Sequence, residues 1–228
     1  MRMNPDGPAA LLLASASPRR RRLLAWLGLP FDVAAFETPE RLDSPLASNP
    51  PALAEHLAKE KVFAARDALP GDPRLVLCFD TIVVLDGAVL GKPDDLEDAW
   101  RMLQALSGRT HQVVTGVALD CPGEDAAAFS VVTDVRMKEL RDESIERWMA
   151  RGEFMGCAGA YNIEGQVAEV DATGCYQNVA GLPLCHLYAA LKAMRPPCSA
   201  GSPTSPIATC DAALGRTCAL GPQAAVGT

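Results

Sequence analysis

The chain has 228 residues, of which 49% are hydrophobic and 21% charged, enough for one large α/β domain with its own core. The formal net charge of −7 argues against a protein that coats a nucleic acid polymer, and an anionic ligand would need a locally positive site. The N-terminal segment contains only a short apolar run, so we expect neither a signal peptide nor a membrane partner, and a cytoplasmic location.

Runs with a strand period alternate with runs of helical period along the chain. The expected strands are residues 11–14, 31–36, 75–85, 112–119, 127–135 and 167–171. The expected helices are residues 18–27, 51–69, 95–107, 144–151 and 184–194, with Asp94 as the N-cap of the third. Hairpin turn signals stand at Asp86-Gly87 and Pro122-Gly123. Because hairpins interrupt the alternation of strands and helices, the order predicts a mixed β-sheet in an α/β fold.

Composition divides the chain into three parts. Residues 1–9 are expected to be a flexible leader, and residues 10–195 a single folded domain. Residues 196–228 are rich in Pro, Gly, Ser, Thr and Ala, which predicts a low-complexity, disordered tail. The eight cysteines form no C-x-x-C pair, so a structural zinc site is not expected.

The first candidate for chemistry is the run Ser15-Ala16-Ser17-Pro18-Arg19-Arg20-Arg21-Arg22, which joins a strand to a capped helix start. Free backbone N–H groups and the helix dipole favour an anion at such a start, and guanidinium groups match phosphate geometry. Adjacent helical positions point about 100° apart, so the four arginines cannot share one site. Ser17, Arg19 and Arg20 are the phosphate-binding candidates, and Arg21 and Arg22 are assigned to a solvated basic face.

The second candidate is Asp80, the one charge within the strand LVLCFDTIVVL. A carboxylate among large apolar residues is costly unless it is paired or binds a metal, whereas the alternative is an aspartate on the wet face of a half-buried strand. Lys92 follows in Gly91-Lys92-Pro93, but the Walker A spacing is absent. Lys61, in LAKEKV, is equally weak evidence by itself.

Taken together, these stretches resemble the Maf family of nucleoside triphosphate pyrophosphatases. The matching stretches are LLLASASPRRRRLLAWLGLPF, the pair Glu37-Thr38, LAKEKV, FDTIVVLDGAVLGKP, the A-x-x-ML-x-x-LSG run from Ala99, H-x-V-x-TG from His111, CAGAYNIEG from Cys157 and NVAGLPL from Asn178. They occur in the family's order and cover about residues 11–194. The C-terminal tail lies outside the match.

The resemblance implies an elongated α/β fold with a central twisted mixed sheet and a deep cleft flanked by helices. It also implies a homodimer, a nucleoside triphosphate substrate and a divalent metal cofactor, Mg²⁺ or Mn²⁺. By the same analogy Asp80 is the proton acceptor. Phosphate-side positions are matched by Ser17, Arg19, Arg20, Lys61 and Lys92. Glu37 and Asp80 are the carboxylates on the metal side.

The chain departs from the family pattern in two places. The segment between Phe31 and Glu37 is about three residues shorter than usual, so Glu40 rivals Glu37 as the metal-side carboxylate. At the base-specificity positions, Arg19 and Thr81 match the dTTP/UTP subgroup, but Glu164 stands where that subgroup has Gln and the 7-methyl-GTP subgroup has Glu. An amide suits uracil or thymine, and an ionised Glu suits the donors of guanine. The sequence therefore leaves the base open.

The expected activity is hydrolysis of a nucleoside triphosphate to the monophosphate and pyrophosphate, a reaction of the acid-anhydride hydrolases that would also remove modified nucleotides. Water attacks the α-phosphorus while charge develops on the phosphates, a step that suits a carboxylate base, fixed cations and a metal. The alternative is a catalytically silent nucleotide-binding regulator of cell division. The intact set of Asp80, Lys61 and Lys92 favours the enzyme.

Overall fold

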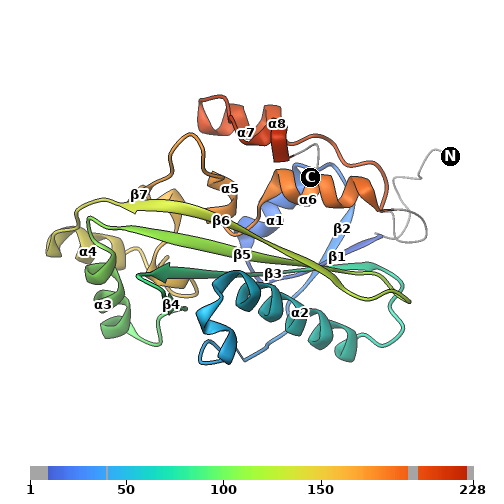
Figure 1. The fold of residues 1–228 in the computed structure, drawn as a ribbon, viewed down its shortest axis with the longest axis horizontal. Coiled ribbons are helices and arrows are strands. Elements are labelled where there is room, and N and C mark those ends of the chain that lie inside the picture. Colours follow the sequence, from blue (N-terminus) through green and yellow to red (C-terminus); the bar gives the residue numbers. More distant parts are fainter. Residues whose placement is uncertain (1–9, 40, 195–199, 225–228) are drawn as a thin grey trace.

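The computed structural model of the chain describes residues 10–39, 41–194 and 200–224, and shows an elongated α/β domain (Figure 1). A mixed seven-stranded sheet in the order β2-β1-β3-β5-β6-β7, with β4 paired to β3, runs along its length. β1 is parallel to β2 and β3, and every other pair is antiparallel. The strands are β1 (Leu11–Ala14), β2 (Phe31–Ala34), β3 (Leu75–Leu85), β4 (Ala88–Leu90), β5 (Thr110–Asp120), β6 (Ala127–Met137) and β7 (Ala168–Glu169).

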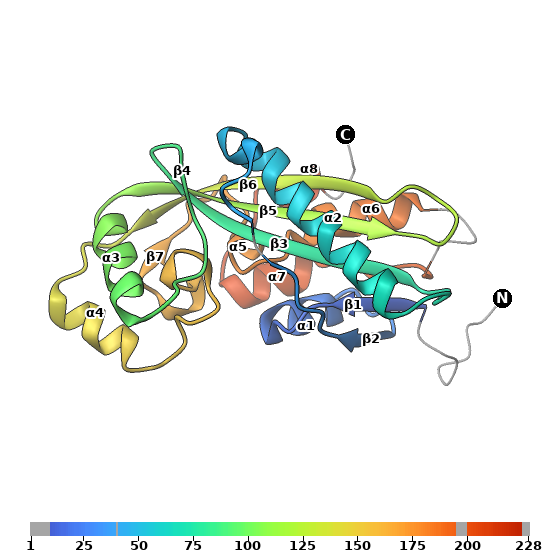
Figure 2. The ribbon, with the colours of Figure 1, turned by 90° about the horizontal axis from the view of Figure 1, so that it is seen from below.

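Helices cover both faces of this sheet (Figures 1 and 2). The helices are α1 (Pro18–Ala25), α2 (Pro50–Ala68), α3 (Leu96–Leu106), α4 (Asp142–Met149), α5 (Tyr176–Val179), α6 (Leu184–Ala193), α7 (Ile207–Leu214) and α8 (Gly221–Ala224). Short 3-10 turns lie at η1 (Pro45–Ser48), η2 (Ala158–Ala160) and η3 (Ile163–Gly165). α2 lies on one face, and α1, α5 and α6 lie on the other. None of these described helices has an apolar run long enough to cross a membrane.

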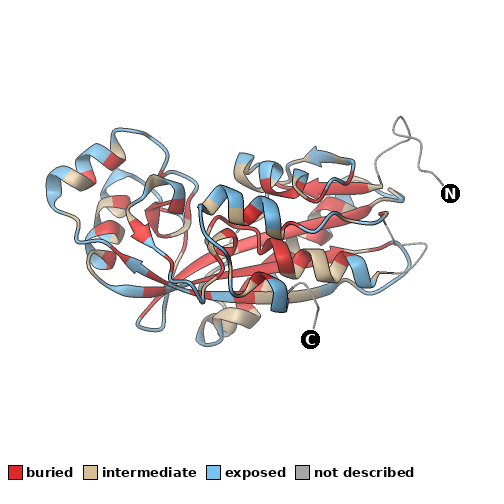
Figure 3. Cartoon of the chain, turned by 90° about the horizontal axis from the view of Figure 1, so that it is seen from above, coloured by how far each residue is buried: buried red, intermediate tan, exposed pale blue. Residues whose placement is uncertain are grey.

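The period of two along the strands divides the core between the two faces of the sheet. Leu11 and Leu13 of β1 belong to the large cluster that also contains the leucines of α1 and α6. Leu12, between them, belongs to a separate cluster with Ala58 and Val62 of α2. Because both faces of the central strands are covered, most of their residues are buried, and these strands are largely red in Figure 3.

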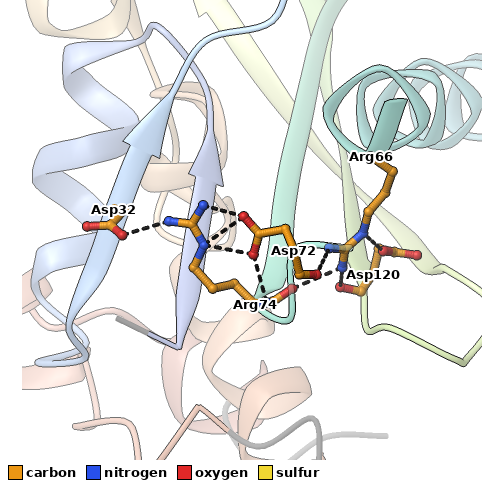
Figure 4. Close-up of polar contacts among 5 residues, drawn as sticks. All are labelled: Asp32, Arg66, Asp72, Arg74 and Asp120. Atoms are coloured by element: carbon orange, nitrogen blue, oxygen red, sulfur yellow. Dashed lines mark hydrogen bonds and ion pairs between the residues drawn. The ribbon is translucent and has the colours of Figure 1, made fainter. Parts of the chain in front are cut away.

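A network of charged side chains ties together the chain segments at the end of the sheet where β3 begins (Figure 4). Arg74 donates to both carboxylate oxygens of Asp72. Its Nη1 also donates to Asp32 Oδ2 at 2.6 Å. Arg66 of α2 pairs with Asp120, at the end of β5, and donates to the backbone carbonyl groups of Asp72, Arg74 and Asp120. The Arg74 guanidinium lowers the pKa of Asp72 to about 2.

The segment after α6 differs from the disordered tail expected over residues 196–228. Within its described part, α7 and α8 are helical, and Ala200 and Cys210 are buried. The Thr204 N–H donates to the Leu27 carbonyl at 2.8 Å, and Arg216 donates to the carbonyl groups of residues 170 and 171. Composition misled because small side chains allow close packing even where large apolar groups are few. The expected leader, residues 1–9, lies outside the described residues, as do 195–199 and 225–228.

Candidate active site

The candidate site lies at an interruption in the pairing along one edge of β3. β1 pairs with this strand only as far as Leu77, and β4 pairs with the same edge only from Val83 onwards. The opposite edge is paired with β5 from Val76 to Val84, with Asp80 across from Gly116. In the described part of the chain, residues 78–82 therefore have no registered strand partner on the first edge. Such a gap in an α/β sheet is a place where a ligand can reach the strand.

A narrow inner pocket of about 80 Å³ lies at this gap and shares several wall residues with a wide outer cleft of about 1130 Å³. The inner pocket is lined by the sequence candidates Ser17, Arg19, Arg20, Lys61, Asp80, Thr81 and Lys92. The outer cleft adds the two remaining candidates, Glu37 and Glu164. Glu40, the rival of Glu37, lies outside the described residues. The fold thus brings candidates that are up to 147 positions apart in the sequence around one connected hollow.

Asp80 is buried and paired with Lys61 of α2. Val76 and Cys78 pack against α2, and because side chains alternate along a strand, Asp80 faces the same helix. Its Oδ1 accepts a hydrogen bond from the Lys61 Nζ, and the two side chains are 3% and 16% exposed. The alternative of an aspartate on a wet strand face is therefore wrong. The ammonium group meets the requirement that a buried carboxylate have a partner.

The start of α1 has the capped geometry that the sequence predicts. Ser17 is the N-cap, and its Oγ accepts from the Arg20 N–H at 3.4 Å. Pro18 occupies the first turn, where its missing N–H removes no helix hydrogen bond. The α1 N-terminus therefore meets the pocket with its positive dipole end and with the side chains that follow Pro18.

The arginines of α1 point to different walls, as the rotation between helix positions requires. Arg19 Nη2 donates to the Cys157 Sγ at 3.2 Å. Arg20 Nε donates to the Gly181 carbonyl at 2.8 Å, and its guanidinium lies 5.7 Å from the centre of the Phe79 ring. Arg22 was expected on a solvated face, but although half exposed it pairs with the Glu164 carboxylate and lines the outer cleft.

One wall of the inner pocket was missed by the sequence analysis. Tyr161 lines the pocket, and its hydroxyl lies 2.6 Å from His111 Nε2 in an edge-to-face ring contact. Burial raises the pKa of Tyr161 and lowers the pKa of His111 to about 4, so the pair is neutral near pH 7. Both residues lie in quoted motifs, but the 50 positions between them hide the contact in the sequence.

The carboxylates fit a metal ion only in combination with a ligand. Asp80 lies in the inner pocket, and the exposed Glu37 lies in the outer cleft. Among the residues that the structure describes, no three His, Cys, Asp or Glu side chains form a metal-binding group. Mg²⁺ is commonly bound by one or two carboxylates together with substrate phosphates. This donor set therefore fits a hard cation that arrives with a phosphate-bearing ligand.

Comparison with known proteins gives a consistent result. A family model described as "Maf-like protein" matches residues 10–194. A protein of Geobacter metallireducens named dTTP/UTP pyrophosphatase is 45% identical over 190 residues, which cover 81% of this chain and 95% of that protein. One of the same name from Symbiobacterium thermophilum is 48% identical over 176 residues, covering 76% of this chain and 88% of that protein.

Among solved structures, the Ham1 protein of Staphylococcus aureus matches at a TM-score of 0.40 and 15% identity, over 56% of this chain and 71% of that one. The family model spans the folded body of the domain and every candidate site residue, from Ser17 to Glu164. The chain belongs to the Maf family.

Proposed function

We propose that this chain hydrolyses a nucleoside triphosphate to the monophosphate and pyrophosphate, and that its base is uracil or thymine. The observation that carries the proposal is the meeting of a paired, buried carboxylate with basic side chains in one pocket at a capped helix start. The two relatives described above, both named dTTP/UTP pyrophosphatase, support the activity and the choice of base. We also propose that the protein is a homodimer, as the resemblance to the Maf family implies.

The basic side chains of the pocket bind the phosphates. Arg19 and Arg20 come from α1, Lys61 from α2, and Lys92 from the loop after β4. They supply the locally positive site that an anion needs in a chain of net charge −7. The N–H groups at the start of α1 add to the same field. Preorganised cations of this kind stabilise the charge that develops on phosphate oxygens during hydrolysis.

Asp80 accepts the proton of the attacking water. The Lys61 ammonium group donates to one carboxylate oxygen, and Asp80 lines the inner pocket. The strand around it is rigidly paired to β5, so the carboxylate has a fixed position against a bound triphosphate. Asp80 and Glu37 would hold a divalent metal together with phosphate oxygens, and such an ion would neutralise phosphate charge.

The base lies in the outer cleft, next to Glu164. The Glu164 carboxylate is paired with Arg22, so a guanidinium group already occupies the acceptor that the N–H donors of guanine would use. This pairing and the names of the relatives favour uracil or thymine over 7-methylguanine. The exposure of the two side chains, 52% and 40%, makes the pair breakable, and this is why the assay must include 7-methyl-GTP.

The test is a panel of dTTP, UTP, 7-methyl-GTP and ATP, assayed for pyrophosphate and monophosphate with Mg²⁺ or Mn²⁺ and with chelator. We expect pyrophosphate from dTTP and UTP, and loss of the activity with chelator. Release of orthophosphate would refute the reaction, and a preference for 7-methyl-GTP would refute the base. Tight nucleotide binding without product would favour the regulator of cell division instead.

Asp80→Asn has a matched control in Asp120→Asn. Both aspartates lie in central strands and pair with a cation of α2, but Asp120 pairs with Arg66 at the end of the sheet and lines neither cavity. We expect Asp80→Asn to lower kcat by about a thousandfold, as loss of a catalytic base does, while Asp120→Asn keeps kcat within about threefold. Equal rates in the two variants would remove Asp80 from the mechanism.

A further inference from the structure

A closed ring of hydrogen bonds holds the guanidinium of Arg20 at the pocket wall. Arg20 Nη2 donates to Thr81 Oγ1 at 3.0 Å, and Thr81 Oγ1 lies 2.9 Å from Thr115 Oγ1. Thr115 Oγ1 donates to the Asn178 carbonyl at 3.1 Å, which also accepts from the Gly181 N–H at 2.9 Å. The ring closes where Arg20 Nε donates to the Gly181 carbonyl at 2.8 Å.

The hydrogens of this ring have a single direction. A hydroxyl group has one hydrogen, and Thr115 uses its hydrogen on the Asn178 carbonyl. The hydrogen in the contact between the threonines must therefore come from Thr81, whose oxygen in turn accepts from Arg20. The series of donors therefore runs from Arg20 through Thr81 and Thr115 to a backbone carbonyl, and hydrogen bonds aligned in this way strengthen one another.

The surroundings of the ring are built to keep it in place. Thr115 is fully buried on β5, and Asn178 is fully buried on α5. The two hydrogens of the Asn178 side-chain amide are shared among three acceptors within 3.2 Å of its nitrogen, the backbone carbonyls of Val113 and Val131 and Thr133 Oγ1, and these contacts anchor α5 to the sheet. A Cβ atom at Gly181 would lie 3.4 Å from Arg20 Nε on a backbone of φ +95°, so the approach of the guanidinium favours glycine there.

We propose that Thr115 is a positioning residue, which acts through Thr81 to fix the orientation of the Arg20 guanidinium. Thr81 then presents no hydroxyl hydrogen to a ligand, because that hydrogen is used on Thr115. Thr115 and Asn178 lie in the motifs H-x-V-x-TG and NVAGLPL, to which the sequence analysis gave no role. The effect on turnover rests on the proposed function, whereas the effect on Arg20 does not.

The test compares Thr115→Val, which keeps the shape and removes the hydroxyl, with Thr115→Ser, which restores it. Thr133→Val is the matched control, because Thr133 is also buried and contacts α5 through Asn178 but does not reach Arg20. We expect Thr115→Val to lower kcat/KM for UTP by about tenfold, the upper end of the effect of one hydrogen bond between neutral groups, and the other two variants to stay within about threefold.

Two further measurements separate positioning from general support. In the Arg20→Lys background, Thr115→Val should have little additional effect, since the residue it positions is gone. The Arg20 Nε–H signal in ¹⁵N NMR, assigned by its loss in Arg20→Lys, should be sharp in the wild type and Thr133→Val and broadened in Thr115→Val. If Thr115→Val does not fold, Thr81→Val cuts the ring one link nearer Arg20 at a half-buried position.

An unchanged Nε–H signal in Thr115→Val, additive effects in the double variant, or an equal loss in Thr133→Val would each overturn the proposal. If the wild type releases no pyrophosphate from any nucleotide, the proposed function fails, and the NMR comparison alone decides whether Thr115 orients Arg20.

Discussion

Gly116 of β5 lies against the backbone of α2, and replacing it with alanine should displace that helix. A Cβ atom built at Gly116 lies 2.0 Å from the Ala54 carbonyl oxygen and 2.2 Å from its carbonyl carbon. Because Cβ atoms essentially never come closer than 3.0 Å to another atom, α2 must withdraw by at least about 1 Å. Both contacts are to backbone atoms, so no change of rotamer relieves them.

The displacement should reach the candidate site. Lys61 is two helical turns beyond Ala54 on the same face of α2, and Gly116 is directly across from Asp80 in the β3–β5 register. We expect Gly116→Ala to lower the free energy of unfolding by about 2–3 kcal/mol through overpacking. A misplacement of about 1 Å between reacting groups can cost a hundredfold in rate, so kcat/KM should fall by about that factor.

Urea unfolding and pyrophosphate release measure the two effects. Gly221→Ala is the control, because this buried glycine has no left-handed φ and its nearest contact would be at an ordinary 3.6 Å. Ala54→Gly should fail to rescue Gly116→Ala, since the clash is with the carbonyl group. A Gly116→Ala protein within about 0.5 kcal/mol of wild-type stability, below the strain expected of overpacking, would refute the reasoning.

Three other changes test the electrostatics and the C-terminal helices. Burial lowers the pKa of His111 from 6.5 to about 4, so as the pH falls the unfolded chain takes up the proton before the folded chain does. The free energy of unfolding should therefore decrease by about 3 kcal/mol as the pH falls from 6.5 to 4. Measured by urea unfolding, His111→Phe should flatten this pH dependence. Arg74 lowers the pKa of Asp72 from 3.8 to about 2, so the stabilisation by this carboxylate is present above pH 3.8 and is lost as the pH falls to 2. Asp72→Asn should remove about 1–2 kcal/mol of the loss of stability in acid. An unchanged slope of unfolding free energy against pH would contradict the assigned role of Arg74. Arg216→Ala should speed proteolytic cleavage within residues 200–224 severalfold, because it removes two hydrogen bonds to backbone carbonyls; equal cleavage rates would show that the contact does not hold the segment.

The elements that sequence predicts best are those with a sharp change of pattern at both ends. The strands Leu11–Ala14 and Leu75–Leu85 agree with expectation to the residue; Ser15 follows the first, and Arg74 and Asp86 flank the second. The expected N-cap of the third helix, Asp94, is wrong: Asp95 is the cap. Two adjacent aspartates are equally good caps, and only the packing of the helix chooses between them. The strand expected over 167–171 shortens to Ala168–Glu169 because pairing with β6 ends there.

The sequence identified which residue types line the site but not how they contact one another. Charge, capping and motif order were enough to place Arg20 and Asp80 on the list of candidates. The contacts of Thr115 with Thr81 and Asn178 span 34 and 63 positions, and no local period records them. Thr81 is the clearest case: the resemblance makes it a base-specificity position, whereas its hydroxyl lies in the ring that holds Arg20.

The two ion pairs between α2 and the sheet are alike in pairing and differ in access, and the role that we propose for Asp80 depends on this difference. Arg66 donates to Asp120 and to three backbone carbonyls, and neither residue lines the inner pocket or the outer cleft. Lys61 pairs with Asp80 at the one stretch of β3 that neither β1 nor β4 covers among the described residues. The helix and the kind of contact are the same, so the open strand edge is the difference. Blocking the open edge of β3 should therefore abolish turnover even with the Asp80–Lys61 pair intact. Breaking the Arg66–Asp120 pair should instead lower the free energy of unfolding and leave turnover unchanged.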